Sequence, residues 1–371
     1  MVLTTRNIVH YLLERGLLTR ESVVDGDLWI VESTRRNRNY KVIRRQNPGY
    51  FVKQVQTFDH QAISSLRCES SCYWLANNDR DFAALAPLLP AYHDFDAGAN
   101  VLVLDLLPGS ESLTEVHRRT GEFSLDSAES LARILATYHR GISVSARKSS
   151  LEATFPQRVP WILSIDQLNP AGAGVMSGGN TQIVGIIQRY PEFRASLETL
   201  RAQWTAQCLI HGDVKWENCL LLANDGKGQQ ELKLIDWELA DFGDPCWDVG
   251  AVFQAYLSFW IFSMPAQAET TTDVLVSRAQ FPVEKMQPAM QHFWQKYAEF
   301  TEIPAKKRPQ KLERSVRCAA ARMIQTAYEY MYYQPQVSTN VLYLLQVSLN
   351  VLTRPQEAIE ELLGFSGAFH A

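Results

Sequence analysis

The sequence predicts an α+β protein with two lobes: a small lobe built on an antiparallel sheet, and a larger, mostly helical lobe. Three observations lead to this prediction. Short strand-like runs fill residues 28–55 and recur at 90–106, helical periodicity dominates from about residue 110 onward, and the segment LLPGS at 106–110 separates the two patterns. We therefore expect a first lobe at residues 1–108 and a second lobe at residues 109–371.

The composition excludes several classes of protein. With 371 residues, 46% of them hydrophobic, the chain can bury a substantial core. Its net charge of −4 fits neither a disordered acidic tail nor a nucleic-acid-binding polycation. Six scattered cysteines without a CxxC pair indicate reduced, buried thiols. The most apolar stretch, 252–264, is too short to span a bilayer. We expect a cytoplasmic protein with no nucleic-acid or membrane partner, and the sequence does not indicate an oligomeric state.

The first lobe is expected to begin with an amphipathic helix over residues 5–15. Its apolar side chains Ile8, Tyr11 and Leu12 share one side, and its polar residues are unlike those of a signal peptide. Gly16 suits the left-handed residue that often ends a helix.

The sheet of this lobe is expected in five short runs. LWIV, NYKVIR and YFVKQV come first, with a turn at Pro48-Gly49 between the last two. A helix follows at about 59–77, and PAYHDF and VLVLDL then flank a turn at residues 96–98.

The second lobe is expected to be helical around a short stretch of strand. The segment from Ser124 to Tyr138 predicts a helix with Ser124 as its N-cap. Residues 169–180 have the composition of a Gly-rich loop, without the spacing of a dinucleotide fingerprint. Two short strands near 207–210 and 232–236 are expected to form a hairpin, and four or five long helices follow from residue 246.

The strongest chemical pattern is HGDVKWEN at residues 211–218, followed by LIDWE at 234–238. Two carboxylates and an amide oxygen are the ligands that Mg²⁺ accepts beside the phosphates of a nucleotide. Phosphoryl transfer further requires a carboxylate beside the acceptor hydroxyl. Asp213 fits that role of base, while Asn218 and Asp236 fit the metal. The alternative is a polar turn and an aspartate that caps a helix.

At these residues the chain resembles the aminoglycoside phosphotransferase and choline kinase-like family, which has a protein kinase-like fold. LARILATYH at 131–139, LVLDLLPG at 102–109 and GDPCWD at 243–248 are similar to further segments of that family. The resemblance covers roughly residues 28–260 and leaves the C-terminal helices unassigned. It implies ATP and Mg²⁺ as cofactors.

The resemblance also implies roles for individual residues. His211 would hold the catalytic loop and Asp248 would stabilise it from the following helix, both as structural support. Asp105 and Leu107 would lie at the hinge that contacts the nucleotide. Lys215 resembles the lysine of Ser/Thr protein kinases that neutralises the γ-phosphate.

The phosphate-binding lysine is expected to be Lys53, in the run YFVK. Its partner on the next helix would be Glu69, with Asp59 as the less favoured choice. The turn at 32–40 contains no glycine, so Ser33 and Thr34 are the expected donors to the phosphates. Residues 31–53 carry a net charge of +6 and residues 211–248 a net charge of −6, a layout suited to Mg-ATP. The alternative for the arginines of the turn at residues 32–40 is that they form a solvated turn or a patch that docks a partner.

The acceptor is the least determined part of the prediction. Residues 255–371 have ten acidic and eleven basic side chains, which argues against a polycationic aminoglycoside. The first hypothesis is a kinase for a hydroxyl of a small metabolite or antibiotic-like molecule. The second is a kinase for Ser/Thr of a precursor peptide, as in lanthipeptide synthetases, and the third is a nucleotide-binding pseudokinase.

Overall fold

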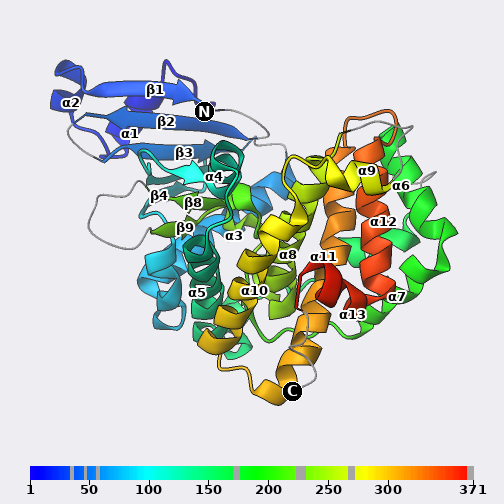
Figure 1. The fold of residues 1–371 in the computed structure, drawn as a ribbon. Helices are drawn as coiled ribbons and strands as arrows, with labels where there is room; N and C mark the ends of the chain where they lie inside the picture. The colour runs from blue at the N-terminus through cyan, green and yellow to red at the C-terminus, as the bar shows by residue number, and fades with distance from the viewer. Residues whose placement is uncertain are drawn as a thin grey trace. The chain divides into compact units, whose positions relative to one another are not determined.

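The computed structural model describes residues 1–33, 37–45, 48–55, 59–169, 176–222, 231–265 and 272–365. The chain forms two compact units, whose ribbons are drawn in Figure 1. The first, called here the sheet unit, contains Met1–Leu113, Ala146–Phe155 and Asn218–Ala240. The second, the helical unit, contains Thr114–Ser145, Pro156–Glu217 and Asp241–Ala371. The predicted lobe boundary between residues 108 and 109 stays a prediction.

The sheet unit is built on a five-stranded antiparallel sheet of order β1-β2-β3-β5-β4. Its strands are β1 Leu28–Glu32, β2 Arg38–Arg44, β3 Tyr50–Gln54, β4 Tyr92–Asp96 and β5 Val101–Asp105. The unit also contains helices α1 Ile8–Glu14, α2 Arg20–Val24 and α3 His60–Asn78, and the 3₁₀ segments η1 Arg80–Leu88, η3 Ser149–Leu151 and η6 Trp237–Leu239. A second, three-stranded sheet joins β6 Glu111–Ser112, β8 Cys219–Leu221 and β9 Leu232–Leu234. The predicted antiparallel sheet is confirmed.

Helix α1 covers one face of the five-stranded sheet. Ile8, Tyr11 and Leu12 pack in one buried cluster with the strand residues Val42 and Val52, as the apolar spacing predicted. Gly16 follows the helix with a φ of +69°, which confirms its left-handed conformation. This face of the sheet therefore forms a hydrophobic core with α1, and Lys53 lies on the opposite face.

Helix α3 confirms the helix predicted at about 59–77. Asp59 is its N-cap, and its side chain accepts a hydrogen bond from the Ala62 N–H at 2.9 Å. Asp59, the less favoured partner for Lys53, thus has a capping role.

The helical unit holds the rest of the described helices. They are α4 Leu113–Thr120, α5 Leu125–Gly141, α6 Gly178–Arg189, α7 Pro191–Ala202, α8 Pro245–Phe262, α9 Thr272–Ser277, α10 Val283–Phe300, α11 Arg308–Tyr330, α12 Thr339–Thr353 and α13 Pro355–Glu357. Shorter helical segments are η4 Trp161–Gln167, η7 Ala305–Lys307 and η8 Ala358–Leu362, and η2 Val144–Ala146 and η5 Trp216–Asn218 end at the boundary of the unit. The strands β7 Cys208–Ile210 and β10 Asp241–Gly243 pair antiparallel. The predicted long C-terminal helices are confirmed, and Ser124 caps α5 as expected.

Helix α8 is the central helix of this unit. It is buried on nearly every side, as a helix with hydrophobic residues all round must be. At Gly250 the backbone of α11 approaches so closely that a Cβ atom there would lie 2.7 Å from the Ala319 nitrogen and 2.7 Å from the Ser315 carbonyl oxygen. The glycine therefore sets the distance between α8 and α11.

Two local predictions were wrong. The strand at 208–210 does not pair with the strand at 232–234: β7 pairs with β10, and β9 pairs with β8. The three residues of β8 form too short a run to be recognised, yet β8 is closer in sequence to β9 than β7 is, so its pairing with β9 closes a shorter loop than the predicted pairing would. The loop predicted over 169–180 ends earlier, because α6 begins at Gly178. Ser177 caps it by accepting the Asn180 N–H.

All six cysteines are buried free thiols, as predicted. Burial raises the pKa of Cys246 to about 12 and also raises the pKa values of Cys72, Cys208 and Cys318. Among the helices of the described residues, none is long and apolar enough to cross a membrane.

Candidate active site

Lys53 lies in β3 of the sheet unit and is only 6% exposed. Its ammonium contacts Glu69 Oε2 on α3 at 2.7 Å and Asp236 Oδ1 at 2.6 Å, and Glu238 Oε2 lies 3.7 Å away. The sequence therefore identified the ion-pair partner on α3, while its role toward a nucleotide stays a prediction. Glu238 was missed, since the pair Trp237-Glu238 shows no pattern that assigns it to a lysine.

The charges around Lys53 shift its titration. Burial lowers the pKa of Lys53, but the carboxylates of Glu69, Asp236 and Glu238 outweigh burial, so the pKa lies above its usual value. Burial raises the pKa of Glu69 to about 7, although the ammonium opposes that shift. Lys53 is thus a permanent cation surrounded by more than one negative group, which is a suitable arrangement for a lysine that shares its charge with an anionic ligand.

The sheet face that bears Lys53 is the face away from α1. In the strand register Lys53 on β3 lies opposite Asn39 on β2. Side chains two residues apart on a strand share a face, so this face also carries Lys41 and Ile43 on β2. Their partners on β1, Val31 and Trp29, lie on the same face. Trp29 is 69% exposed, Ile43 41% and Val31 40%. The face of the sheet that bears Lys53 therefore also carries exposed apolar side chains on β1 and β2. The run LWIV showed the alternation of these side chains, but the sequence pattern alone did not assign them to a ligand.

Asn218 and Asp236 also belong to the sheet unit. They flank β8 and β9: Cys219 pairs with Leu234, and the Ile235 N–H donates to the Asn218 carbonyl at 2.9 Å. The antiparallel ladder therefore brings the two predicted metal ligands to neighbouring strand ends.

The donor set fits Mg²⁺. Asp236 and Asn218 supply a carboxylate and an amide oxygen, and Mg²⁺ is usually held by one or two carboxylates together with substrate phosphates. No group of three or more His, Cys, Asp or Glu side chains in the described part of the chain could hold a metal. Asp236 has a φ of +67°, a left-handed conformation that is uncommon outside glycine and that clusters at functional sites.

The remaining predicted nucleotide contacts lie elsewhere in the sheet unit. Asp105 is opposite Tyr50, on the face covered by α1, and its carboxylate contacts His93 Nε2 at 2.5 Å. Its side chain is thus not brought to the face of Lys53. Leu107 is half-buried, and its carbonyl accepts from Ser110 Oγ at 2.8 Å. Ser33 is exposed and its N–H donates to the Asn39 carbonyl at 2.8 Å, whereas Thr34 lies outside the described residues.

The part of the predicted catalytic loop from His211 to Glu217 belongs to the helical unit and follows β7. Asp248 on α8 is fully buried, and its Oδ2 accepts the His211 N–H at 2.7 Å while its Oδ1 accepts the Gly212 N–H at 3.0 Å. The Asp213 N–H in turn donates to His211 Nδ1 at 3.2 Å. Gly212 has a φ of +80°, which favours glycine in this turn. These contacts fit the supporting roles predicted for His211 and Asp248, and those roles remain predictions.

Two cations contact the Asp213 carboxylate. Lys215 Nζ is 2.7 Å from Oδ2, and Arg322 Nη2 on α11 is 3.1 Å from Oδ1. Burial raises the pKa of Asp213, but Lys215 and Arg322 outweigh burial and lower the pKa to about 2. Sequence reasoning missed Arg322, because 109 residues separate it from Asp213 and nothing in its segment marks it.

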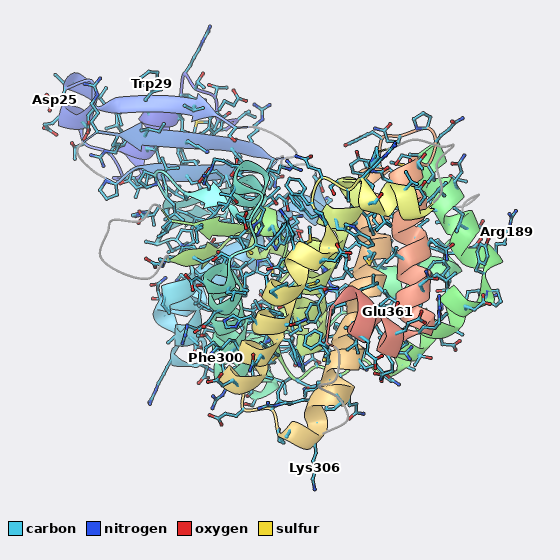
Figure 2. All side chains as sticks on the ribbon, viewed as in Figure 1. Asp25, Trp29, Arg189, Phe300, Lys306 and Glu361 are labelled. Atoms are coloured by element: carbon cyan, nitrogen blue, oxygen red, sulfur yellow. The ribbon has the colours of Figure 1, made fainter. Side chains whose placement is uncertain are left out.

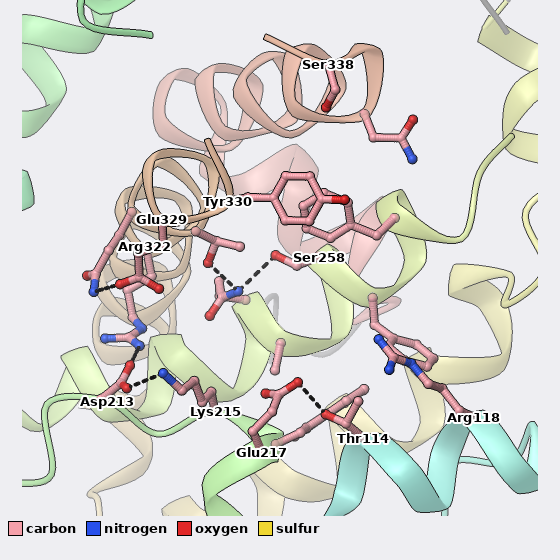
Figure 3. A pocket seen from close by; sticks show the side chains of 18 residues that line it. Thr114, Arg118, Asp213, Lys215, Glu217, Ser258, Arg322, Glu329, Tyr330 and Ser338 are labelled. Carbon is pink, nitrogen blue, oxygen red and sulfur yellow. Dashed lines mark hydrogen bonds and ion pairs between the residues drawn. The ribbon is translucent and has the colours of Figure 1, made fainter. Parts of the chain in front are cut away.

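A cavity of about 590 Å³ opens at this carboxylate, and residues of the helical unit form its whole lining. Figure 3 shows Asp213 and Lys215 on one side and Ser338 on another, with Glu217 and Thr114 along the base. Trp216, Phe259, Phe262 and Tyr330 supply aromatic surface. Gln254 donates from Nε2 to Ser258 Oγ at 2.9 Å and Thr326 Oγ1 at 3.0 Å. Such a volume and mixed lining suit a small organic molecule.

Comparison with known proteins agrees with this architecture. A sequence model described as the phosphotransferase enzyme family matches residues 30–279. Comparison with curated protein sequences finds no match.

Solved structures share the fold. The GDP complex of wild-type aminoglycoside 2'-phosphotransferase-IIIa is 13% identical, with 92% of this chain and 98% of that chain covered and a TM-score of 0.54. The streptomycin-ATP-APH(2")-IIa ternary complex is 15% identical, with 95% and 99% covered and a TM-score of 0.51. Amicoumacin kinase hAmiN with AMP-PNP, Ca²⁺ and Ami is 12% identical, with 94% and 96% covered and a TM-score of 0.51. Because the family match spans well over half of the 371 residues, the chain belongs to the phosphotransferase enzyme family and is an enzyme with a protein kinase-like fold.

Proposed function

We propose that the chain transfers the γ-phosphate of ATP, with Mg²⁺, to a hydroxyl group of a small molecule that binds in the cavity beside Asp213. The observation that carries this proposal is the carboxylate of Asp213 at the wall of a cavity with a mixed polar and aromatic lining. A carboxylate at such a place can accept the proton of a bound hydroxyl.

The sheet unit supports the binding of a nucleotide. Lys53 offers a buried ammonium for the phosphates, and Glu69 keeps it oriented. Trp29, Val31 and Ile43 offer an apolar surface on the same sheet face, suited to the flat ring of a nucleobase. A purine triphosphate has both of these parts, a flat ring and a chain of anions.

Asn218 and Asp236 would hold the magnesium ion. When bound, Mg²⁺ supplies positive charge to the phosphates and balances the charge that develops during transfer.

The helical unit carries the acceptor chemistry. The acceptor hydroxyl donates its hydrogen bond to Asp213, which fixes the oxygen for attack on the γ-phosphorus. The new bond joins the acceptor oxygen to the γ-phosphorus, the bond from that phosphorus to the oxygen of ADP breaks, and the hydroxyl proton passes to Asp213 and then to solvent. A carboxylate with a pKa of about 2 is ionised at neutral pH, so it is ready to accept a hydrogen bond but is a weak base. Its contribution is therefore chiefly orientation, with the proton leaving late.

The lining of the cavity narrows the acceptor. It contains three carboxylates (Asp213, Glu217, Glu329) and three cations (Arg118, Lys215, Arg322). Two of the cations are paired with Asp213, Glu217 accepts from Thr114 Oγ1 at 2.8 Å, and Glu329 accepts from Gln325 Nε2 at 2.8 Å. This lining has no excess of acid, so we propose a neutral or weakly charged acceptor that carries hydroxyls and an apolar or aromatic part, rather than a polycation.

The test is to incubate the protein with Mg-ATP and a panel of acceptors, and to measure ADP and phosphorylated product by mass spectrometry. The panel includes streptomycin as a polycation, amicoumacin, neutral hydroxylated aromatics and a Ser/Thr peptide. We expect phosphorylation of a neutral or weakly charged member and little of streptomycin. A phosphopeptide as the main product would favour the peptide hypothesis, and ATP binding without turnover of any acceptor would favour the pseudokinase.

Asp213→Asn tests the role of the carboxylate. We expect turnover to fall by about 10²- to 10⁴-fold, the usual contribution of a positioned acid or base. Asp166→Asn is the matched control, because Asp166 is also shielded, with 9% of its side chain exposed, and lies 3.8 Å from Arg201, but it does not line the cavity. Wild-type turnover by Asp213→Asn would contradict the proposed function.

A further inference from the structure

Asp213 is held at its two oxygens by two different elements. Arg322 on α11 donates from Nη2 to Oδ1 at 3.1 Å, and Lys215 of the catalytic loop contacts Oδ2 at 2.7 Å. Figure 3 shows both interactions as dashed lines on either side of the carboxylate. The two oxygens are therefore not equivalent.

The two cations differ strongly in how firmly they are held. The Arg322 side chain is 4% exposed, its Nη1 donates to the Gly212 carbonyl at 2.8 Å, and its guanidinium carbon lies 5.2 Å from the ring centre of Trp247. The Lys215 side chain is 39% exposed and carries its charge on a flexible stem. A bound molecule therefore displaces Lys215 at lower cost than Arg322, because displacing Arg322 would leave a buried charge without its partners.

We propose that Arg322 is a positioning residue: it fixes Oδ1 of Asp213, so that Oδ2 is the oxygen that takes the acceptor hydroxyl. This inference rests on the proposed function of Asp213. It means that α11, through Gln325, Thr326 and Glu329, lines the acceptor cavity and also sets the orientation of the group that receives the acceptor's proton. Lys215 then moves from Oδ2 toward the transferred phosphoryl group, in keeping with the role predicted for it.

The charge of Asp213 is stabilised by Lys215, by Arg322 and by His211, whose Nδ1 accepts the Asp213 N–H. Removal of Arg322 leaves Asp213 with one cation fewer. The pKa of Asp213 should therefore rise toward the usual range, and the loss of activity on acidification should begin at a higher pH. Because Oδ1 also loses its hydrogen bond from Arg322, we expect kcat to fall by about 10- to 100-fold.

The experiment compares Arg322→Met, Arg322→Lys and Arg314→Met with the wild type. Arg314 is the matched control: it lies on the same helix, and its Nε donates to the buried Asp244 at 2.6 Å, but it does not line the cavity. ADP release from Mg-ATP, with water as the acceptor, is measured from pH 3 to pH 9, so that the range includes the ordinary pKa of an aspartate, about 3.9. We expect Arg322→Met to shift the acid limb upward with an unchanged KM for ATP, Arg322→Lys to restore part of both losses, and Arg314→Met to change neither.

The outcomes separate this inference from the function on which it rests. Wild-type ADP release by Asp213→Asn would contradict the proposed function itself. If Asp213→Asn is inactive while Arg322→Met keeps the wild-type acid limb, or if Arg314→Met moves that limb as far, Arg322 is a structural residue only and the inference is overturned.

A second measurement needs no turnover. Urea unfolding at pH 3 and pH 7 measures how much Asp213→Asn changes the free energy of unfolding in the wild-type, Arg322→Met and Arg314→Met backgrounds, because the contribution of Asp213 is lost only below its unfolded pKa of about 3.9. We expect the pH dependence of that effect to shrink with Arg322→Met and to persist with Arg314→Met. Equal pH dependence in all three backgrounds would overturn the inference.

Discussion

At the scale of single residues, Lys53 is a buried cation that three carboxylates of the sheet unit share. Lys53→Met should leave Glu69, Asp236 and Glu238 without their shared cation, and we expect the free energy of unfolding to fall by about 3 kcal/mol. Glu69→Gln in the same chain should recover part of that loss, because it removes one of the uncompensated charges. Urea unfolding of both single variants and the double variant measures the coupling. If the change in unfolding free energy of the double variant equals the sum of the two single changes, Lys53 and Glu69 have no coupling energy, which would contradict this prediction.

Asp248 gives a pH dependence of stability. Burial raises its pKa, but hydrogen bonding and charge from His139 and the contacts of His211 outweigh burial, so the folded pKa lies below the usual value. The stability that Asp248 contributes is therefore fully present above the unfolded pKa of about 3.9, and is lost as the pH falls through the lower folded pKa. We expect Asp248→Asn to cost about 3 kcal/mol at pH 7 and clearly less near pH 3. Urea unfolding at both values measures it, and the exposed Asp126→Asn should change stability by less than about 1 kcal/mol at either pH.

Residues also show what a sequence can and cannot predict. Asp213, Asn218 and Asp236 stand in short motifs whose residue types suit the proposed chemistry. Lys53 and Glu69 lie on consecutive elements, β3 and α3, and the family resemblance was enough to select them as a pair. Arg322, Glu238 and Trp29 were missed. Their importance comes from contacts or from a shared sheet face, and no spacing rule connects Arg322 on α11 with a loop 109 residues earlier.

At the scale of elements, the packing of α8 on α11 decides where Arg322 stands. A Cβ at Gly250 would clash with backbone atoms of α11 at 2.7 Å, so Gly250→Ala must push the helices apart or strain them. We expect the free energy of unfolding to fall by about 2 kcal/mol and turnover to fall with it, because Asp213 loses its fixed partner. Thermal unfolding and ADP release measure the two effects.

Helix α6 offers the control for this prediction. Gly185 is exposed, and a Cβ there would meet nothing within 4 Å. Gly185→Ala should therefore stabilise the protein by about 0.5 to 1 kcal/mol with unchanged turnover. A loss of stability at Gly185 equal to that of Gly250→Ala would contradict the assignment of the cost at Gly250 to its close packing against α11.

Elements were predicted well where they were long or strongly alternating. The five strands of the main sheet and the helices α1, α3, α5, α8, α10, α11 and α12 follow from periodicity and caps. The pairing of β8 with β9 could not be predicted in this way, since a run of three residues carries no periodicity of its own. A strand this short forms because neighbouring strands supply its hydrogen-bond partners, and those partners are known only from the folded structure.

At the scale of the whole molecule, binding of Mg-ATP should stabilise the folded chain by mass action. At a ligand concentration 100 times the dissociation constant we expect about 2.7 kcal/mol of added stability, seen as a higher Tm. Removing Mg²⁺ with EDTA should abolish most of this gain, because the phosphates then lack the cation that Asn218 and Asp236 are proposed to hold.

Two tryptophans of the sheet unit test the proposed nucleobase surface in the same assay. Trp29→Ala should reduce the Tm shift with Mg-ATP, since it removes the exposed aromatic ring on the sheet face of Lys53. Trp74→Ala on α3 removes a ring that is 50% exposed and should leave the shift unchanged. Equal shifts in both variants would contradict the assignment of this face to the nucleobase.

Because all six cysteines are buried, a cysteine introduced at the surface can be labelled without first replacing the native ones. Thiols react as thiolates, and a thiol that is shielded and whose pKa is raised presents almost none at neutral pH. We expect the folded protein to take up no maleimide, and Tyr333→Cys, at a position that is 88% exposed, to take up one equivalent by intact mass. A fluorophore can thus be attached to the helical unit without replacing a single native residue of its core.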